Sequence, residues 1–253
     1  MNITEALFTG INSIYLPEID STNLFAMNLL SKTNPPEGTC VYTAYQSAGR
    51  GQIGRFWYSS DGKNLLISYI FYPKPLKAID QFILNIISGL AVRDVVGMYC
   101  DNVKIKWPND IYVDDKKIAG ILVQNILRGT DIKATVIGIG LNVNEQHFPS
   151  EIPNPVSISQ ITSKSHDLAE IRQLLSSKLE FYFMKMKYGH HEWLKETYIN
   201  TMYRINETAN FKTDGETIIF GKIRGVNEQG KLLIQVESED VLAFGFREIG
   251  YVI

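Results

Sequence analysis

The segment Gly49-Arg50-Gly51-Gln52-Ile53-Gly54-Arg55 decides whether the chain has a nucleotide-binding fold of the Rossmann or Walker type. Its three glycines fit the pattern G-x-G-x-x-G, which in a dinucleotide-binding fold opens directly into a helix. Here it opens instead into Phe56-Trp57-Tyr58 and a turn-like stretch over residues 59–62. A Walker loop is excluded as well, because Arg55 and Phe56 stand where that pattern needs Lys and Ser or Thr. Glycine permits close backbone approach and arginine pairs with phosphate or carboxylate, so the segment predicts a flap over an anion.

Composition excludes several functional classes. The chain has 253 residues, 45% of them hydrophobic and 21% charged, which allows one large domain or a main domain with a small appendage. A net charge of −2 argues against a general nucleic-acid binder. Cys40 and Cys100 cannot form a disulfide framework, and none of the four histidines has metal-ligand spacing. The chain shows neither a leader pattern nor a membrane-length apolar run, so we expect a cytoplasmic protein with no membrane partner.

Hydrophobic periodicity predicts a mixture of strands and helices. Residues 111–113 and 118–126 form a predicted hairpin that continues into a third antiparallel strand, residues 133–143. Gly120 interrupts the second of these strands, which indicates a bulge or a backbone approached by a ligand. Further strands are expected over residues 14–16, 39–46, 64–72 and 103–107, and helices over residues 24–30, 79–99, 168–187 and 190–203.

The pattern changes near residue 204. Short strands are predicted over residues 208–212, 217–226, 231–236 and 241–246, joined by turns rich in Gly, Asn and Asp. Several short strands within so few residues are typical of a small β-barrel. We therefore expect a main domain over residues 1–203 and a barrel over residues 204–253.

Four polar segments lie at predicted strand ends in the main domain, where binding groups are often placed. Taken singly, each also fits an ordinary helix cap, a turn or a solvated strand face. The segments are Ser21-Thr22-Asn23, Gln46 with the glycine loop, Lys106-Trp107-Pro108-Asn109-Asp110, and Gly138-Ile139-Gly140-Leu141-Asn142-Val143-Asn144.

In this order, and together with Lys116-Lys117-Ile118-Ala119-Gly120, these segments resemble the signatures of biotin–protein ligases. The resemblance implies an α+β fold, with a mixed or antiparallel sheet backed by helices as in class II synthetases, and an SH3-like barrel after it. It implies an enzyme that converts biotin and MgATP to biotinyl-5′-AMP and then biotinylates a lysine of a biotin carboxyl carrier protein. Mg²⁺ is expected with ATP, with no metal site made by the protein alone.

The resemblance also implies roles for single residues. Lys106 and Arg50 are the expected catalytic cations, acting between the biotin carboxylate and the α-phosphate. The expected biotin-binding residues are Ser21, Thr22, Asn23, Gln46, Arg50, Gly51, Gln52, Lys106 and Gly120, and the expected ATP or adenylate contacts are Arg50, Arg55, Trp57, Asn109 and Asn142.

Two departures from the family pattern lead to further expectations. Gln52 stands where many members carry an arginine that helps retain the adenylate, so we expect looser retention here. The match begins near residue 14, which leaves no room for the winged helix that some relatives carry. We therefore expect a monofunctional ligase without DNA binding, for which homodimerisation by sheet-edge pairing is open.

Three alternatives remain at this point. A lipoate–protein ligase shares the fold and the adenylation chemistry, although the glycine loop and the Lys106–Asp110 motif favour biotin. A non-catalytic biotin sensor would bind ligand but would not need Arg50 and Lys106 at an α-phosphate. An unrelated α/β protein would need all five motifs to arise in order by chance.

Overall fold

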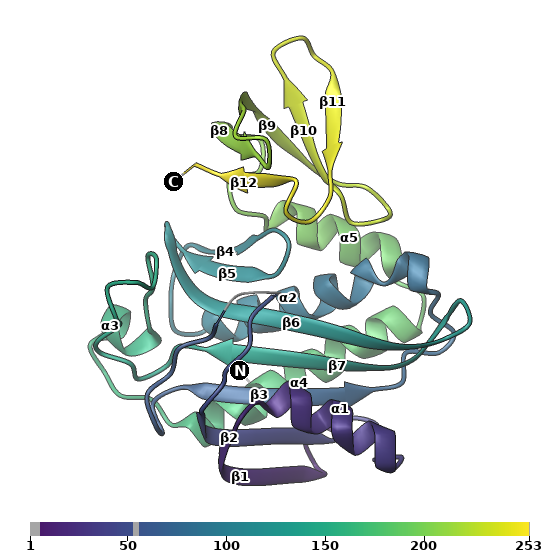
Figure 1. The fold of residues 1–253 in the computed structure, drawn as a ribbon, viewed down its shortest axis with the longest axis vertical. Helices are drawn as coiled ribbons and strands as arrows, with labels where there is room; N and C mark the ends of the chain where they lie inside the picture. The colour runs from purple at the N-terminus through teal and green to yellow at the C-terminus, as the bar shows by residue number, and fades with distance from the viewer. Residues whose placement is uncertain (1–5, 53–55, 253) are drawn as a thin grey trace.

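The computed structural model describes residues 6–52 and 56–252 (Figure 1). The strands of its main sheet are β1 (Ser13–Ile19), β2 (Cys40–Gln46), β3 (Leu65–Phe71), β4 (Val103–Lys106), β5 (Asp110–Val113), β6 (Lys116–Arg128) and β7 (Asp131–Leu141). They form a seven-stranded sheet in the order β1-β2-β3-β7-β6-β5-β4. β1 pairs with β2 in parallel and the other neighbours are antiparallel, which confirms the predicted mixed sheet.

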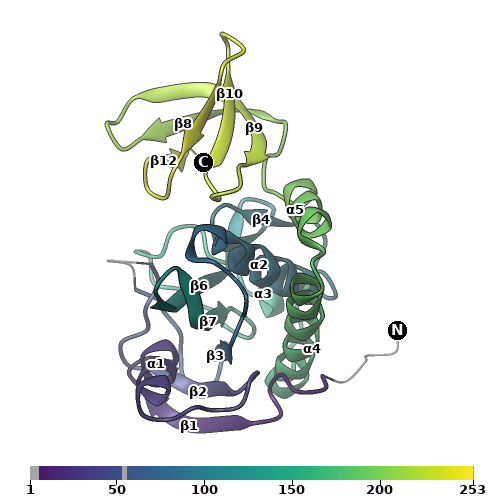
Figure 2. The same ribbon diagram turned by 90° about the vertical axis from the view of Figure 1, so that its right-hand side faces the viewer.

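Helices cover both faces of this sheet (Figure 2). The helical elements are α1 (Thr22–Lys32), η1 (Ala78–Asp80), α2 (Phe82–Val96), α3 (Ile158–Thr162), α4 (Leu168–Lys187) and α5 (His191–Asn200). α1 packs on one face, where Ala26 meets Val41, Ile70 and Val136 in a small buried cluster. α2 and α4 lie on the opposite face. Both faces of the sheet can pack against helices, because successive side chains of a strand point to opposite sides.

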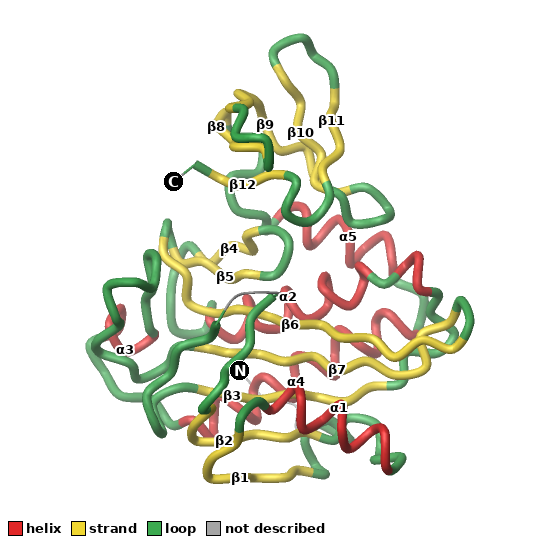
Figure 3. Tube along the Cα trace, viewed as in Figure 1, coloured by secondary structure: helices red, strands yellow, loops and turns green. Residues whose placement is uncertain are grey.

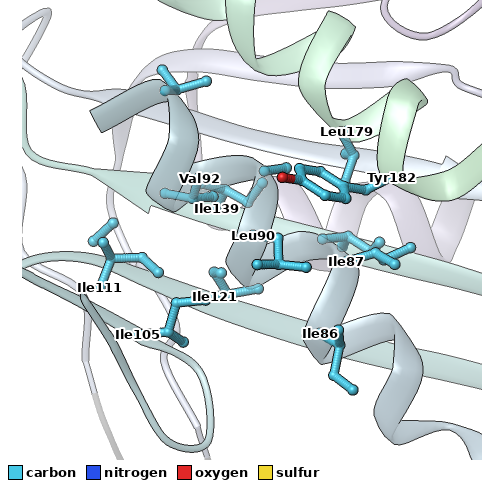
Figure 4. Packing of buried hydrophobic residues seen from close by; sticks show 14 of the residues in the cluster. Ile86, Ile87, Leu90, Val92, Ile105, Ile111, Ile121, Ile139, Leu179 and Tyr182 are labelled. Atoms are coloured by element: carbon cyan, nitrogen blue, oxygen red, sulfur yellow. The ribbon is translucent and has the colours of Figure 1, made fainter. Parts of the chain in front are cut away.

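The larger core lies between the sheet and α2. Figure 4 shows Ile87 and Leu90 of this helix beside Ile121 and Ile139 of the sheet, all of them buried. α2 is buried over most of its surface because α4 and α5 pack against it as well. It is shorter than the predicted helix over residues 79–99, since the chain before it forms the separate 3-10 turn η1.

A second sheet follows the main one and lies beyond β4 and α5 (Figure 3). Its strands are β8 (Thr208–Thr213), β9 (Ile218–Val226), β10 (Leu232–Val236), β11 (Val241–Phe244) and β12 (Ile249–Tyr251). They are antiparallel, in the order β11-β10-β9-β8-β12, as a small SH3-like unit requires. The sequence did not predict β12, which has three residues, or α3, which has five. In the described part of the chain, no helix is long and apolar enough to cross a membrane.

Candidate functional site

A cavity of about 680 Å³ opens on the main sheet and is lined by residues from all four polar segments. The predicted site residues that line it are Ser21, Thr22, Asn23, Gln46, Arg50, Gly51, Gln52, Trp57, Lys106, Asn109, Gly120 and Asn142. The remaining predicted residue, Arg55, lies outside the described part of the chain. Residues far apart in the sequence therefore meet in one cavity.

One end of the cavity is a network of neutral polar groups at the start of α1. Ser21 is the N-cap of this helix, and its Oγ accepts from the Leu24 amide at 3.5 Å. Thr22 donates through both its backbone N–H and its hydroxyl to Gln46 Oε1, at 2.9 and 3.1 Å. The buried Ser68 hydroxyl lies 2.8 Å from Thr22 Oγ1. This network holds neutral donors and acceptors in fixed directions, which suits a neutral polar head group.

Asn23 is held against the sheet by three contacts. Its Nδ2 donates to Leu122 O at 3.2 Å and to Gln124 Oε1 at 3.1 Å, and its Oδ1 accepts from Ser68 at 2.5 Å. A Cβ built on Gly138 would lie 2.0 Å from Asn23 Oδ1. Only glycine fits there, so Gly138 determines how closely α1 approaches β7.

The wall of the cavity also carries Lys106, at the end of β4. Its Nζ donates to Tyr112 Oη at 3.0 Å. Burial lowers the pKa of Lys106 to about 8, although the nearby Asp110 carboxylate acts in the opposite sense. The ammonium form therefore predominates at neutral pH. Such a partly desolvated cation can interact strongly with an anionic substrate.

Two further cations line the same cavity. Lys117 pairs with Asp110 at 2.6 Å across β5 and β6. Arg50 is exposed and forms an isolated antiparallel bridge with Phe56. The flap over an anion stays a prediction, because residues 53–55 of the glycine loop lie outside the described part of the chain.

Trp57 fills a slot made by two glycines that face each other on β6 and β7. Gly120 and Gly140 are cross-strand partners. A Cβ on Gly120 would lie 2.9 Å from Trp57 Cζ3, and one on Gly140 would lie 2.4 Å from Trp57 Cε2. The predicted close approach at Gly120 is therefore made by the indole ring. The buried Trp57 Nε1 has no hydrogen-bond partner within the described protein.

The sequence profile of the biotin/lipoate A/B protein ligase family matches residues 15–142. The bifunctional ligase/repressor BirA of Bacillus spizizenii is 33% identical over 240 residues, which cover 90% of this chain and 71% of the relative. The chain belongs to the biotin/lipoate A/B protein ligase family.

Other members support the same assignment. The biotin–[acetyl-CoA-carboxylase] ligase of Paracoccus denitrificans is 27% identical over 228 residues, covering 87% of this chain and 92% of the relative. The structure of Aquifex aeolicus biotin protein ligase in complex with biotin and ATP aligns with a TM-score of 0.78 and 28% identity. That alignment covers 95% of this chain and 98% of the Aquifex chain, so the family fold extends over both sheets.

In the present chain, two residues that are predicted to contact the adenylate, Asn109 and Asn142, also hold the backbone of the site through hydrogen bonds. Asn109 Nδ2 donates to Ile121 O at 2.5 Å and so fixes the turn between β4 and β5 against β6. Asn142 Nδ2 donates to Val156 O at 3.0 Å and ties the end of β7 to the segment before α3. Both side chains are buried but still line the cavity.

Several cavity residues were missed by sequence reasoning. Tyr112 follows the Lys106–Asp110 motif closely, and this proximity to the motif could have identified it as a site residue. Nothing in the sequence pointed to Tyr251 of the second sheet, which also lines the cavity. Ser68 was missed as well; it does not line the cavity, but its hydroxyl contacts the lining residues Thr22 and Asn23. Among residues 6–52 and 56–252, no group of three or more His, Cys, Asp and Glu side chains could hold a metal ion.

Proposed function

We propose that this chain activates biotin as biotinyl-5′-AMP and transfers it to a lysine of a biotin carboxyl carrier protein. The observation that carries the proposal is the cavity itself, which holds a neutral polar network at one end and Lys106 with Arg50 elsewhere on its wall. The neutral end fits a ureido head group, and the cations fit a carboxylate and an α-phosphate. A relative at 28% identity, the Aquifex ligase, has been solved with biotin and ATP.

The first step joins two anions. A carboxylate oxygen of biotin attacks the α-phosphorus of ATP, the Pα–Oβ bond breaks, and pyrophosphate leaves with its electron pair. Lys106 offsets the repulsion between carboxylate and phosphate and the charge that builds on the phosphoryl oxygens. Arg50 supplies a second cation from the base of the flap. Mg²⁺ enters with ATP and neutralises part of the polyphosphate charge.

The second step transfers the acyl group. The neutral ε-amine of the carrier lysine attacks the carbonyl carbon of the mixed anhydride, AMP leaves, and the amine nitrogen loses a proton. Trp57, Asn109 and Asn142 border the part of the cavity that we assign to the adenylate. The flap that contains Gly51 and Gln52 would cover the anhydride and exclude water, which would otherwise hydrolyse it.

Exchange of labelled pyrophosphate into ATP tests the first step, with biotin or lipoate as the added acid. We expect exchange with biotin, MgATP and the full chain, and none without the acid. Exchange driven by lipoate alone would identify a lipoate ligase and overturn the choice of substrate.

Streptavidin detection of a carrier domain after incubation with biotin and MgATP tests the second step. A labelled carrier supports the ligase. Biotin binding with neither exchange nor labelling would instead identify a biotin sensor.

We also propose the division of the chain into a catalytic domain, residues 1–203, and a barrel domain, residues 204–253. The change from one sheet to the other between Asn200 and Thr208 supports it. For a homodimer we propose pairing through β1, an end strand of the main sheet. Sedimentation measurements with and without biotin and ATP would test that pairing.

A further inference from the structure

The ammonium group of Lys106 lies among three aromatic rings. Its Nζ is 4.4 Å from the centroid of the Tyr112 ring, 4.9 Å from that of Tyr251 and 5.9 Å from that of Tyr203. All three distances are within the range of a cation–π interaction. We call these residues the tyrosine cage.

The three rings of the tyrosine cage come from different parts of the chain. Tyr112 belongs to β5 and Tyr251 to β12 of the second sheet. Tyr203 lies on the segment between the two sheets, where its N–H donates to Ile105 O at 2.9 Å, directly before Lys106. The Tyr203 ring packs against both others, with centroid distances of 5.3 Å to Tyr112 and 5.8 Å to Tyr251. One wall of the cage is therefore supplied by the C-terminal sheet.

Contacts beside the cage hold the second sheet in register with β4. Trp107, the residue after Lys106, donates through its indole N–H to Gly230 O at 2.8 Å. Its ring also packs against Phe246, with the centroids 5.4 Å apart. On the other side, Arg204 Nη1 donates to Val252 O at 3.0 Å, next to Tyr251. The position of the Tyr251 ring is thus fixed from two directions relative to Lys106.

We propose that Tyr251 is a positioning residue for Lys106, and that through it the C-terminal sheet forms part of the adenylation site. The inference rests on the proposed function, because it concerns the cation assigned to the first step. Tyr251 lines the cavity, and its role in this mechanism is exerted through the lysine. It acts by holding the lysine Nζ where the carboxylate and the α-phosphate meet.

The protonation state of Lys106 depends on every charge that faces its ammonium group. Asp110 and Asp115 favour its ammonium form, whereas Lys117, Arg204 and burial disfavour it. The π faces of the cage also favour the ammonium form, because the ring quadrupole is negative above the ring. Replacing the Tyr251 ring by an apolar side chain of similar bulk would keep the burial but remove this attraction. The pKa of Lys106 would then fall below its value of about 8.

The experiment compares Tyr251→Leu, which removes the π face, with Tyr251→Phe, which keeps it. Tyr188→Leu is the matched control, since Tyr188 is 72% exposed at the C-cap of α4. For Tyr251→Leu we expect kcat of biotin-dependent exchange on the acid plateau to fall about tenfold, within the ~100-fold range of a ~1 Å misplacement. The alkaline limb of the pH–rate profile should move to lower pH by about one unit, because a typical cation–π contribution corresponds to a pKa change of that size. KM for biotin should change less than about twofold, because the polar network at α1 is untouched.

We expect Tyr251→Phe to keep the wild-type alkaline limb and to retain more of kcat than Tyr251→Leu, because the π face remains. Tyr188→Leu should match the wild type in both. The inference is overturned if Tyr251→Leu keeps the wild-type kcat and alkaline limb, or if Tyr251→Phe loses as much as Tyr251→Leu. Should Tyr251→Leu fail to fold, Tyr251→Met takes its place, because methionine also lacks a π face.

A second readout is independent of activity. NMR titration of the Lys106 side chain, assigned with Lys106→Arg, should give a lower pKa in Tyr251→Leu than in the wild type and in Tyr251→Phe. Equal pKa values in the three proteins would refute the cage. Wild-type protein without exchange activity would refute the proposed function, while the titration would still decide whether Tyr251 holds the lysine.

Discussion

Adding one methyl group at Gly140 tests the slot that holds Trp57. A Cβ at this position would lie 2.4 Å from Trp57 Cε2, 2.6 Å from Nε1 and 2.8 Å from Cδ2. Non-bonded carbons prefer ~3.5 to 4.0 Å, so the indole ring must move by about 1 Å or more. Gly140 has no left-handed backbone conformation, so Gly140→Ala adds a steric conflict without backbone strain.

The loss of stability that this steric conflict causes in Gly140→Ala can be predicted. An extra methyl in a well-packed region costs about 1 to 3 kcal/mol. For a protein of this length, each ~1 kcal/mol lowers Tm by about 2 to 4 °C, so we expect a decrease of roughly 2 to 12 °C. If the indole leaves the slot instead, the loss of stability is smaller and the adenylate side of the cavity changes shape. In that case KM for ATP rises in the exchange assay.

The assay combines thermal unfolding, pyrophosphate exchange and the fluorescence of Trp57. Gly215→Ala is the matched control, because a Cβ there would meet only Thr213 Oγ1 at 3.8 Å. In a Trp57→Ala background, Gly140→Ala should be nearly neutral, since the clash has been removed. Unchanged Tm and ATP KM in Gly140→Ala, or an equal loss in the Trp57→Ala background, would refute the slot.

Three other variants test separate parts of the molecule. Lys106→Ala should reduce the rate of pyrophosphate exchange by about 10² to 10³-fold, because it removes a group that stabilises charge in the transition state. Full exchange activity in this variant would show that Lys106 is wrongly assigned. Gln52→Arg should slow release of biotinyl-5′-AMP in a trapping assay, and equal off-rates would remove the role we give to Gln52. The buried Glu180 carboxylate accepts the N–H groups of residues 7, 8 and 9 at 2.8 to 2.9 Å. Glu180→Gln should therefore lower the free energy of unfolding by about 1.5 to 3 kcal/mol in urea, while the exposed Glu228→Gln should not.

The alkaline limb of the exchange reaction gives one more test of the wild type. The pKa of Lys106 is lowered by burial to about 8, so its ammonium is present below that pH and lost above it. We expect kcat/KM, which reports the ionisations of the free enzyme, to fall as pH rises through about 8. A kcat/KM that stays constant to pH 10 would mean that Lys106 is not the cation the reaction needs.

Much of the fold could be predicted because its signals are local. The N-caps Ser21 and Asp167 are of residue types that favour this position, and each accepts a backbone N–H at the start of its helix. α4 has the predicted bounds, since its apolar spacing continues over many turns. α3 and β12 were missed because a few residues carry too little periodicity to be recognised.

The candidate site was predicted through motifs, and the residues outside the motifs were not. Ser68 lies in a strand whose seven residues are all buried, and its serine is an ordinary residue in that sequence. Its role arises only because α1 brings Thr22 and Asn23 within hydrogen-bonding distance. Gly138 was noted as part of a motif, but the reason for it, contact with Asn23, requires the packed structure.

The sequence by itself determined the order of the longer strands and helices, the change of pattern near residue 204, and the polar segments of the glycine loop and the Lys106–Asp110 motif. These follow from periodicity and residue chemistry over short stretches. The tertiary structure alone decided that those segments share one cavity, that Trp57 lies over paired glycines, and that Tyr251 reaches Lys106. The physical reason is that close packing is set by sheet order and domain docking, and those bring together residues whose spacing along the chain carries no signal.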